Sequence, residues 1–147
     1  MFIDQLHTAG ALPTLAATMR FAGQRQQLIA HNIANFETPN YRPRDVSPAS
    51  FQRMLGEAVQ ARRESNGGTS GALPMGGTRE IAVSPRGELS LKPRTASGNI
   101  LFHDRNNRDL ERTMQAMVEN SATFRVAADF MRSRGGVIRS AIAERVS

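Results

Sequence analysis

The chain has 147 residues, enough for one ordinary domain, and it contains no Cys, which excludes a disulfide framework and thiol chemistry. Its formal charge of +6 comes almost entirely from arginine and is spread along the chain, whereas nucleic-acid-binding proteins usually concentrate basic residues on one face or in a tail. Only 39% of the residues are hydrophobic, and these gather toward the two ends, so we expect a slender assembly rather than a compact globule.

The first twenty residues lack the basic start and the apolar run of a cleaved signal peptide. Residues 1–10 form a mixed amphipathic stretch that suits either a turn of helix or an arm. No stretch of the chain approaches the length of about 20 apolar residues that spans a bilayer. If the protein works outside the cytoplasm, we expect it to leave by a route without signal cleavage.

A heptad pattern predicts a first long helix that begins near Pro13 and ends near Asn35. Proline is tolerated in the first turn of a helix, where its missing N–H costs no helical hydrogen bond. Steps of three and four residues keep an apolar stripe on one side of a helix that supercoils against a partner. The stripe comprises Leu12, Leu15, Met19, Ala22, Gln26, Ile29 and Ile33.

The middle of the chain begins with a short predicted helix. Ser47 and Pro48 suit the N-cap and the first helical position. One amphipathic face then continues to about Arg63 and comprises Phe51, Met54, Leu55 and Ala58. Five glycines between Ser65 and Thr78 predict a flexible linker after this helix.

A small β-hairpin is predicted next, over residues 81–91. Apolar and polar residues alternate on both sides of residues 84–87, Ser-Pro-Arg-Gly, which suit a type I turn. Such a hairpin is marginal on its own in water. We therefore expect the middle of the chain to be partly disordered until something packs against it.

The longest predicted element is a proline-free helix from about Arg108 to Arg145, capped by Asn106 or Asn107. Its heptad seam alternates steps of four and three residues, and this pattern again indicates packing against a partner. The seam comprises Leu110, Met114, Met117, Ser121, Phe124, Ala128, Met131, Gly135, Ile138 and Ile142.

Two heptad helices at opposite ends of one chain are natural partners. The predicted fold is therefore mainly α: long N- and C-terminal helices form a coiled-coil-like hairpin, and the flexible middle carries a short helix and a small β-hairpin. This divides the chain into residues 1–36, 37–106 and 107–147. The C-terminal helix is the longer, so part of its seam lacks cover within one subunit, which favours association with other chains.

No group of residues indicates catalysis, a metal or a cofactor. His7, His31 and His103 are scattered, and no nucleophile or phosphate-loop motif is present. The pair His103 and Asp104 suits a surface hydrogen bond better than a proton relay, because nothing else converges there in the sequence. We expect a protein that is not an enzyme and that binds no cofactor, small-molecule substrate or nucleic acid.

The most specific stretch is residues 32–41, Asn-Ile-Ala-Asn-Phe-Glu-Thr-Pro-Asn-Tyr. It resembles the Asn-Ile-Ala-Asn-x-x-Thr-Pro-Gly-Tyr signature that ends the N-terminal helix of bacterial flagellar rod and hook proteins. The continuation over residues 42–46 with Phe51, and the C-terminal residues 106–112, Met117, 119–120 and 140–142, are similar to the proximal rod proteins of that family. The signature residues are Asn32, Ile33, Asn35, Thr38, Pro39 and Tyr41.

Each signature residue has an expected physical role. The side-chain amides of Asn32 and Asn35 lie on the last helical turn, where they can satisfy carbonyls left without helical partners. Thr38 and Pro39 stop the helix in an extended turn, which Tyr41 anchors against the helices. Asn40 replaces the family's glycine, and asparagine is among the least costly substitutes if this position needs a positive φ.

The resemblance implies a structural subunit of the flagellar rod, whose terminal helices pack with those of many copies into a tube that crosses the periplasm and transmits motor torque. It implies export by the flagellar type III system without signal cleavage. It also implies partners among the rod subunits, the membrane ring and the export apparatus. The residues expected at the assembly seam are Leu12, Leu15, Met19, Ile29, Leu110, Met114, Met117, Phe124, Met131, Ile138 and Ile142.

Two alternatives remain. The chain could be another rod or hook component, although its short length and the Arg-Asp continuation after Tyr41 favour the proximal type. A basic coiled-coil adaptor that binds protein or nucleic acid would use the same two helices, and a steep salt dependence of DNA binding would support it.

Overall fold

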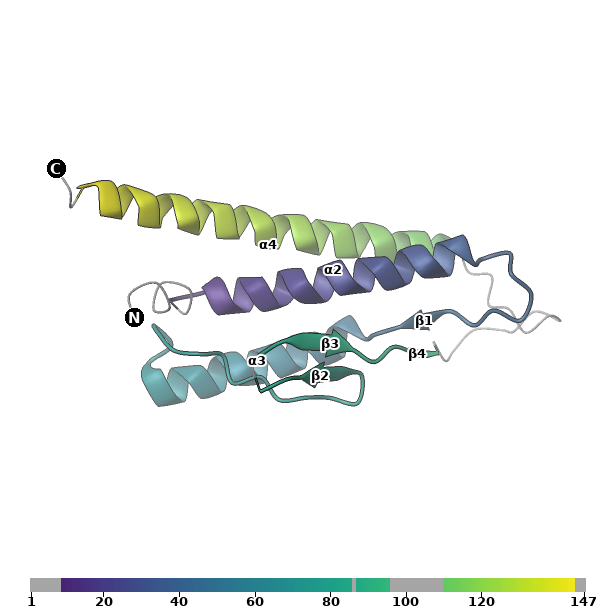
Figure 1. Ribbon diagram of the computed structural model, residues 1–147, viewed down its shortest axis with the longest axis horizontal. Helices are drawn as coiled ribbons and strands as arrows, with labels where there is room; N and C mark the ends of the chain where they lie inside the picture. The colour runs from purple at the N-terminus through teal and green to yellow at the C-terminus, as the bar shows by residue number, and fades with distance from the viewer. Residues whose placement is uncertain (1–8, 86, 96–109, 145–147) are drawn as a thin grey trace.

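The computed structural model describes residues 9–85, 87–95 and 110–144 (Figure 1). Within them the helices are α2 (Leu12–Ala34), α3 (Pro48–Asn66) and α4 (Leu110–Glu144), and the strands are β1 (Arg44–Asp45), β2 (Ile81–Val83), β3 (Leu89–Leu91) and β4 (Arg94–Thr95). Helices α2 and α4 lie side by side and run in opposite directions, while α3 and the strands lie along the other side of α2. The expected arrangement, mainly helical with small strands in the middle, is confirmed.

Helix α2 is the central element of the molecule. It begins at Leu12 with Pro13 in its first turn, and it ends at Ala34, one residue before the predicted end. The helix is buried on two sides. Phe21 packs in the core with residues of α3, whereas the backbone carbonyl of the next residue, Ala22, accepts a hydrogen bond from Asn120 of α4. A helix buried on two sides couples the elements that it contacts.

Helix α3 has the cap expected from its sequence. The Ser47 hydroxyl accepts a hydrogen bond from the Ser50 backbone N–H at 3.2 Å, and Pro48 occupies the first turn. The helix continues past the expected end at Arg63 to Asn66, because Gly67 is the residue that turns into the left-handed region, with φ of 65°.

One core joins α2 to the middle of the chain. The rings of Phe21 and Phe51 stack with centroids 4.1 Å apart and planes only 3° from parallel. Strands β2 and β3 form the expected antiparallel hairpin, with Ile81 opposite Leu91, and they cover this stack. The buried members of the core are Ala17, Phe21, Val46, Phe51, Met54, Ile81 and Leu89.

The glycine-rich segment differs from the flexible linker that we expected. Leu73 and Met75 pack against the core, and the buried Arg62 guanidinium donates to the Ser70 carbonyl at 3.2 Å. The same guanidinium donates to the Gly10 carbonyl at 2.7 Å, so one arginine ties the segment to the start of α2. The linker is therefore held by two apolar side chains and one buried cation.

Helix α4 is 35 residues long and accounts for most of the predicted C-terminal helix. The predicted caps Asn106 and Asn107 lie outside the described residues. Across residues 9–85, 87–95 and 110–144, no helix combines the length and the apolar character needed to cross a membrane.

Candidate functional site

The signature stretch forms a tight turn directly after α2. The Tyr41 backbone N–H donates to the Thr38 carbonyl at 3.2 Å, which closes a four-residue turn with Pro39 in its second position. Asn40, in the third position, has φ of 60°. A positive φ at that position, after proline, is what a type II turn requires, and glycine meets the requirement without strain. The structure thus explains both the family's glycine and its replacement by asparagine.

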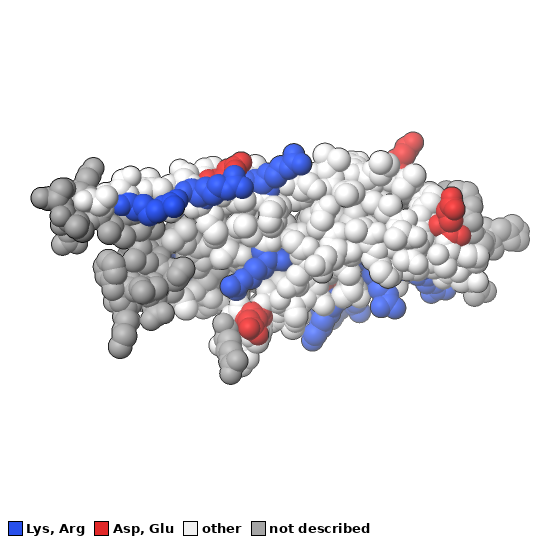
Figure 2. Space-filling view, turned by 45° about the horizontal axis from the view of Figure 1, so that its top comes forward, with Lys and Arg blue, Asp and Glu red and all other residues white. Residues whose placement is uncertain are grey.

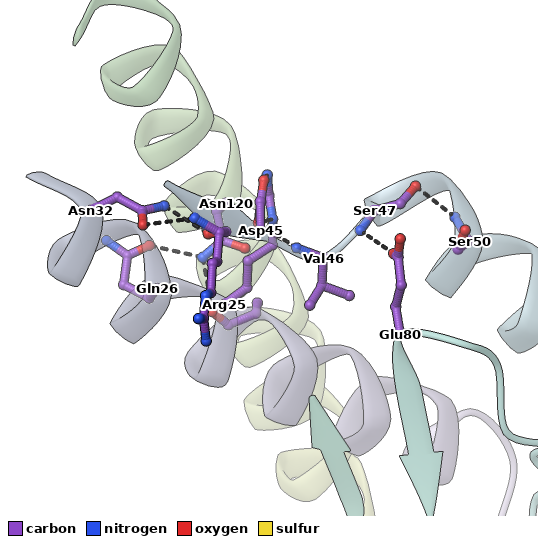
Figure 3. A network of polar contacts seen from close by, with 11 residues as sticks. Arg25, Gln26, Asn32, Asp45, Val46, Ser47, Ser50, Glu80 and Asn120 are labelled. Atoms are coloured by element: carbon purple, nitrogen blue, oxygen red, sulfur yellow. Dashed lines mark hydrogen bonds and ion pairs between the residues drawn. The ribbon is translucent and has the colours of Figure 1, made fainter. Parts of the chain in front are cut away.

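Asn32 has a role that the sequence did not reveal. Its amide Nδ2 donates to the Arg44 carbonyl at 2.7 Å, and its Oδ1 accepts the Arg44 backbone N–H at 3.1 Å. The side chain therefore pairs with β1 as a neighbouring strand would (Figure 3). The expectation that Asn32 satisfies carbonyls of its own helix is wrong, because its amide faces the returning chain.

Asn35 does behave as expected. Its amide Nδ2 donates to the His31 carbonyl at 2.9 Å, so it satisfies a carbonyl in the last turn of α2. Of the other signature residues, Ile33 is half-buried, whereas Thr38 and Pro39 are exposed. The two asparagines of the signature therefore act on different segments of the chain.

Tyr41 anchors the turn against α2. Its hydroxyl donates to Asn32 Oδ1 at 2.8 Å and lies 2.9 Å from His31 Nδ1. Burial raises the pKa of the Tyr41 phenol above its ordinary value, and the charge of Arg44 opposes part of that shift. The neutral phenol is therefore the form that the fold prefers.

A second fastening between α2 and β1 is an ion pair. Arg25, only 6% exposed, donates from Nε to Asp45 Oδ1 at 2.9 Å and from Nη2 to Asp45 Oδ2 at 2.6 Å (Figure 3). Asp45 Oδ1 also accepts the Val46 backbone N–H at 2.8 Å. The sequence alone does not reveal this pair, since the two residues are twenty positions apart and only the fold brings them together.

The contact between α2 and α4 contains one buried amide. Asn120 is 4% exposed, and its Nδ2 donates to the Ala22 carbonyl and to Gln26 Oε1, both at 2.8 Å. The predicted α4 seam omitted Asn120 and named its neighbour Ser121. A buried amide of this kind favours one alignment of two helices over others, because any other leaves it unpaired.

The predicted assembly seam coincides with the helix contact only in part. Ile29 is buried, and Leu12, Leu15, Met19, Met117 and Met131 are half-buried. In contrast, Leu110, Met114 and Phe124 are 37%, 55% and 39% exposed. The side chains of Ile138 and Ile142 lie outside the described part of the structure. The α4 seam is thus only partly covered within one chain, and its exposed members include Leu110 and Met114 in the first half of the helix.

A second apolar surface on α4 was not predicted. Its members are Val118, Val126, Phe130 and Val137, which are between 55% and 69% exposed. Its members follow one another at steps of eight, four and seven residues, on a side of α4 that does not belong to the predicted heptad seam. We call these four residues the outer face of α4.

The sequence of the chain is similar to those of known flagellar proteins. It is 31% identical over 103 residues to the flagellar basal body rod protein FlgB of Borrelia hermsii, a match that covers 68% of this chain and 71% of the relative. The chain belongs to the FlgB family. FlgB proteins of Escherichia coli K12 and Shigella flexneri are each 29% identical over 130 residues, covering 85% of this chain and 86% of theirs. No family model matches the chain.

Membership of the FlgB family identifies the chain as a component of the flagellar basal body rod. The FlgB relatives are structural flagellar proteins. Within the described residues of this FlgB-family chain, no group of three or more His, Cys, Asp or Glu side chains could hold a metal ion.

Proposed function

We propose that this FlgB-family chain is a subunit of the proximal rod, and that it polymerises through its long helices into the tube that transmits motor torque and is required for motility. The observation that carries the proposal is the outer face of α4, where four large apolar side chains lie more than half exposed. Each would gain about 1.5 to 3 kcal/mol on full burial. A rod subunit buries such a face against its neighbours.

The contact between α2 and α4 supports a coiled-coil-like hairpin as the unit that assembles. The two helices run antiparallel with Ala22, Ile29 and Ala128 buried. In this proposal residues 1–36 and 107–147 are the rod helices, and residues 37–106 form the segment between them. The shared core around Phe21 and Phe51 then holds that segment against the hairpin.

The signature turn supports assembly indirectly. Asn32 and Asp45, together with Tyr41, fasten the returning chain to the last half of α2. Because this fastening fixes the direction in which the chain leaves the helix, every copy presents α2 and α4 in the same geometry, as a helical polymer requires. The further partners in this proposal are other rod subunits, the membrane ring and the export apparatus, reached by type III export without signal cleavage.

The proposal is tested by a motility experiment with two variants. Phe124, a seam residue, is 39% exposed, and Phe124→Asp places a carboxylate at that position. In a strain that lacks the wild-type gene, this variant is expected to be produced at normal levels but to abolish rods and swimming. Gln52→Asp, an exposed change on α3, is the matched control and is expected to swim normally. Normal swimming with Phe124→Asp, or with the gene deleted, would contradict the proposal.

A further inference from the structure

A groove lies between α2 and α4, on one side of their contact. Its volume is about 330 Å³, and its lining is mainly apolar. The Phe124 ring lines it from α4 and Gly23 lines it from α2. The remaining lining residues are Ala22, Gln26, Gln27, Asn120, Ser121 and Arg125.

Gly23 keeps this groove open. Glycine inside a helix costs roughly 1 kcal/mol relative to alanine, so its presence calls for a reason. The backbone supplies none, because Gly23 is not among the glycines with positive φ. Packing supplies none either, since an added Cβ would meet only Phe124 Cε2, at 4.0 Å, which is ordinary van der Waals contact. The fold would accept a larger residue, but that residue would occupy the groove.

The same chain carries side chains that suit the groove but cannot enter it. Phe130 is 59% exposed and lies nine residues after Ser121, which is two and a half turns of a helix with 3.6 residues per turn. Phe130 therefore projects from the side of α4 opposite the groove. Only the Phe130 of another copy can reach the groove.

The charges around the two surfaces are complementary. Arg125 lines the groove, and it begins a series of arginines seven residues apart, with Arg132 and Arg139, visible as a blue row over α4 in Figure 2. Asp129 precedes Phe130, and its side chain is 69% exposed. Among the residues that the structure describes, its ion-pair partner is Arg132, which is 79% exposed. An exposed pair of this kind is weak, so Asp129 can exchange it for an arginine of another copy.

We infer that the groove between α2 and α4 receives Phe130 from α4 of a second copy of this chain, with Asp129 of that copy beside Arg125. The inference rests on the proposed function and adds to it the surfaces that meet. The contact joins two different faces of one molecule, so each copy offers a free groove and a free Phe130 after pairing. Such a heterologous contact builds an open helical polymer rather than a closed dimer.

The test uses single cysteines, for which the chain provides a clean background because it has none. Gln27→Cys places a thiol at the groove. Ser133→Cys, a nearly isosteric change, places a second thiol one helical turn after Phe130. The two purified full-length variants are mixed and oxidised, and we expect a mixed disulfide dimer whose yield rises with concentration. Gln60→Cys on α3, also exposed, replaces Gln27→Cys as the control and is expected to give background yield.

A blocked groove distinguishes this contact from nonspecific association. Gly23→Leu in the Gln27→Cys chain is expected to lower the yield by about tenfold or more, the change in affinity that loss of one buried Phe contact produces. Gly56→Leu on α3, where nothing lies within 4 Å of an added Cβ, is the matched control and is expected to have no effect. If Gly23→Leu lowers the melting temperature, Gly23→Ala, which helix propensity favours, replaces it.

Reversal of charge gives a second readout. Asp129→Arg in the Ser133→Cys chain is expected to lower the yield, and Arg125→Asp in the Gln27→Cys chain is expected to restore it. A disulfide yield that Gly23→Leu leaves unchanged would overturn the inference. A yield with Gln60→Cys equal to that with Gln27→Cys would overturn it too. So would a strain with Gly23→Leu that builds normal rods, although the chain would remain a rod subunit. Absence of the chain from purified basal bodies would instead overturn the proposed function.

Discussion

Arg25 and Asp45 form a two-bond ion pair that fastens strand β1 to the middle of α2, with the guanidinium buried and the carboxylate about one-third exposed. Asp45 also accepts the backbone N–H of Val46, a residue that is 1% exposed in the core. The pair therefore connects the exposed signature turn to the packed interior. Its importance for stability follows from the burial of Arg25.

Replacing Arg25 should destabilise the fold. Arg25→Ala removes two charge-assisted hydrogen bonds and is expected to lower the free energy of unfolding by about 2 to 3 kcal/mol, measured by urea denaturation. Arg20→Ala, an exposed arginine on the same helix, is expected to change it by less than about 0.5 kcal/mol. Equal effects of the two variants would show that the ion pair contributes nothing beyond surface charge.

The two signature asparagines should differ in their contribution to stability. Asn32→Ala leaves the Arg44 N–H and carbonyl without their partner, so the free energy of unfolding is expected to fall by about 2 to 3 kcal/mol. Asn35→Ala loses one local hydrogen bond to His31 and is expected to cost about 0.5 to 1 kcal/mol. Denaturant titration of both variants measures the difference, and a larger loss from Asn35→Ala would refute the assignment of their roles.

The conformation of Asn40 predicts an order among substitutions. With φ of 60°, Asn40→Ala is expected to lower the free energy of unfolding by about 1 kcal/mol, whereas Asn40→Gly is expected to raise it by up to about 1 kcal/mol. Thermal melts of both variants test this order. Glu37, which has no positive φ, is the control position, and there the alanine variant should be at least as stable as the glycine variant. If glycine were not more stabilising than alanine at Asn40 either, the result would argue against the turn geometry.

The raised pKa of Tyr41 predicts a loss of stability at high pH. Because the fold prefers the neutral phenol, this contribution is fully present below the unfolded-state value near pH 10 and is lost as pH rises through the folded-state pKa. The free energy of unfolding of the wild type should therefore fall more steeply above pH 10 than that of Tyr41→Phe.

Ultraviolet titration of tyrosinate provides an independent check, because Tyr41 is the only tyrosine of the chain. The folded protein should ionise at higher pH than the protein unfolded in denaturant. Coincident titration curves for the two states would show that burial does not perturb the phenol.

Much of the fold follows from local patterns in the sequence. Pro13 and the heptad stripe placed α2, the Ser47 cap and Pro48 placed α3, and the alternation around residues 84–87 predicted the β2–β3 hairpin. Each of these signals acts within a few residues, where backbone sterics and capping dominate. The resemblance of residues 32–41 to the rod and hook signature led to the family that the comparisons confirm.

What the sequence did not predict depends on contacts between distant residues. The pairing of Asn32 with Arg44 and the ion pair of Arg25 require the chain to turn back on α2. The packing of Leu73 and Met75 shows why glycine content alone was a poor guide to flexibility, since two apolar side chains were enough to hold the segment. The outer face of α4 was not predicted, because a single heptad seam indicates only one partner surface for each helix.

The measurement that most directly tests the central claim is a cryo-electron microscopy reconstruction of basal bodies purified from cells that express this chain. We predict that the chain occupies the proximal rod, with α2 and α4 antiparallel and the outer face of α4 buried against a neighbouring subunit. Absence of the chain from the rod would contradict the account. So would a position in the rod where Val126 and Phe130 face solvent and all subunit contacts come from α3 and the β2–β3 hairpin.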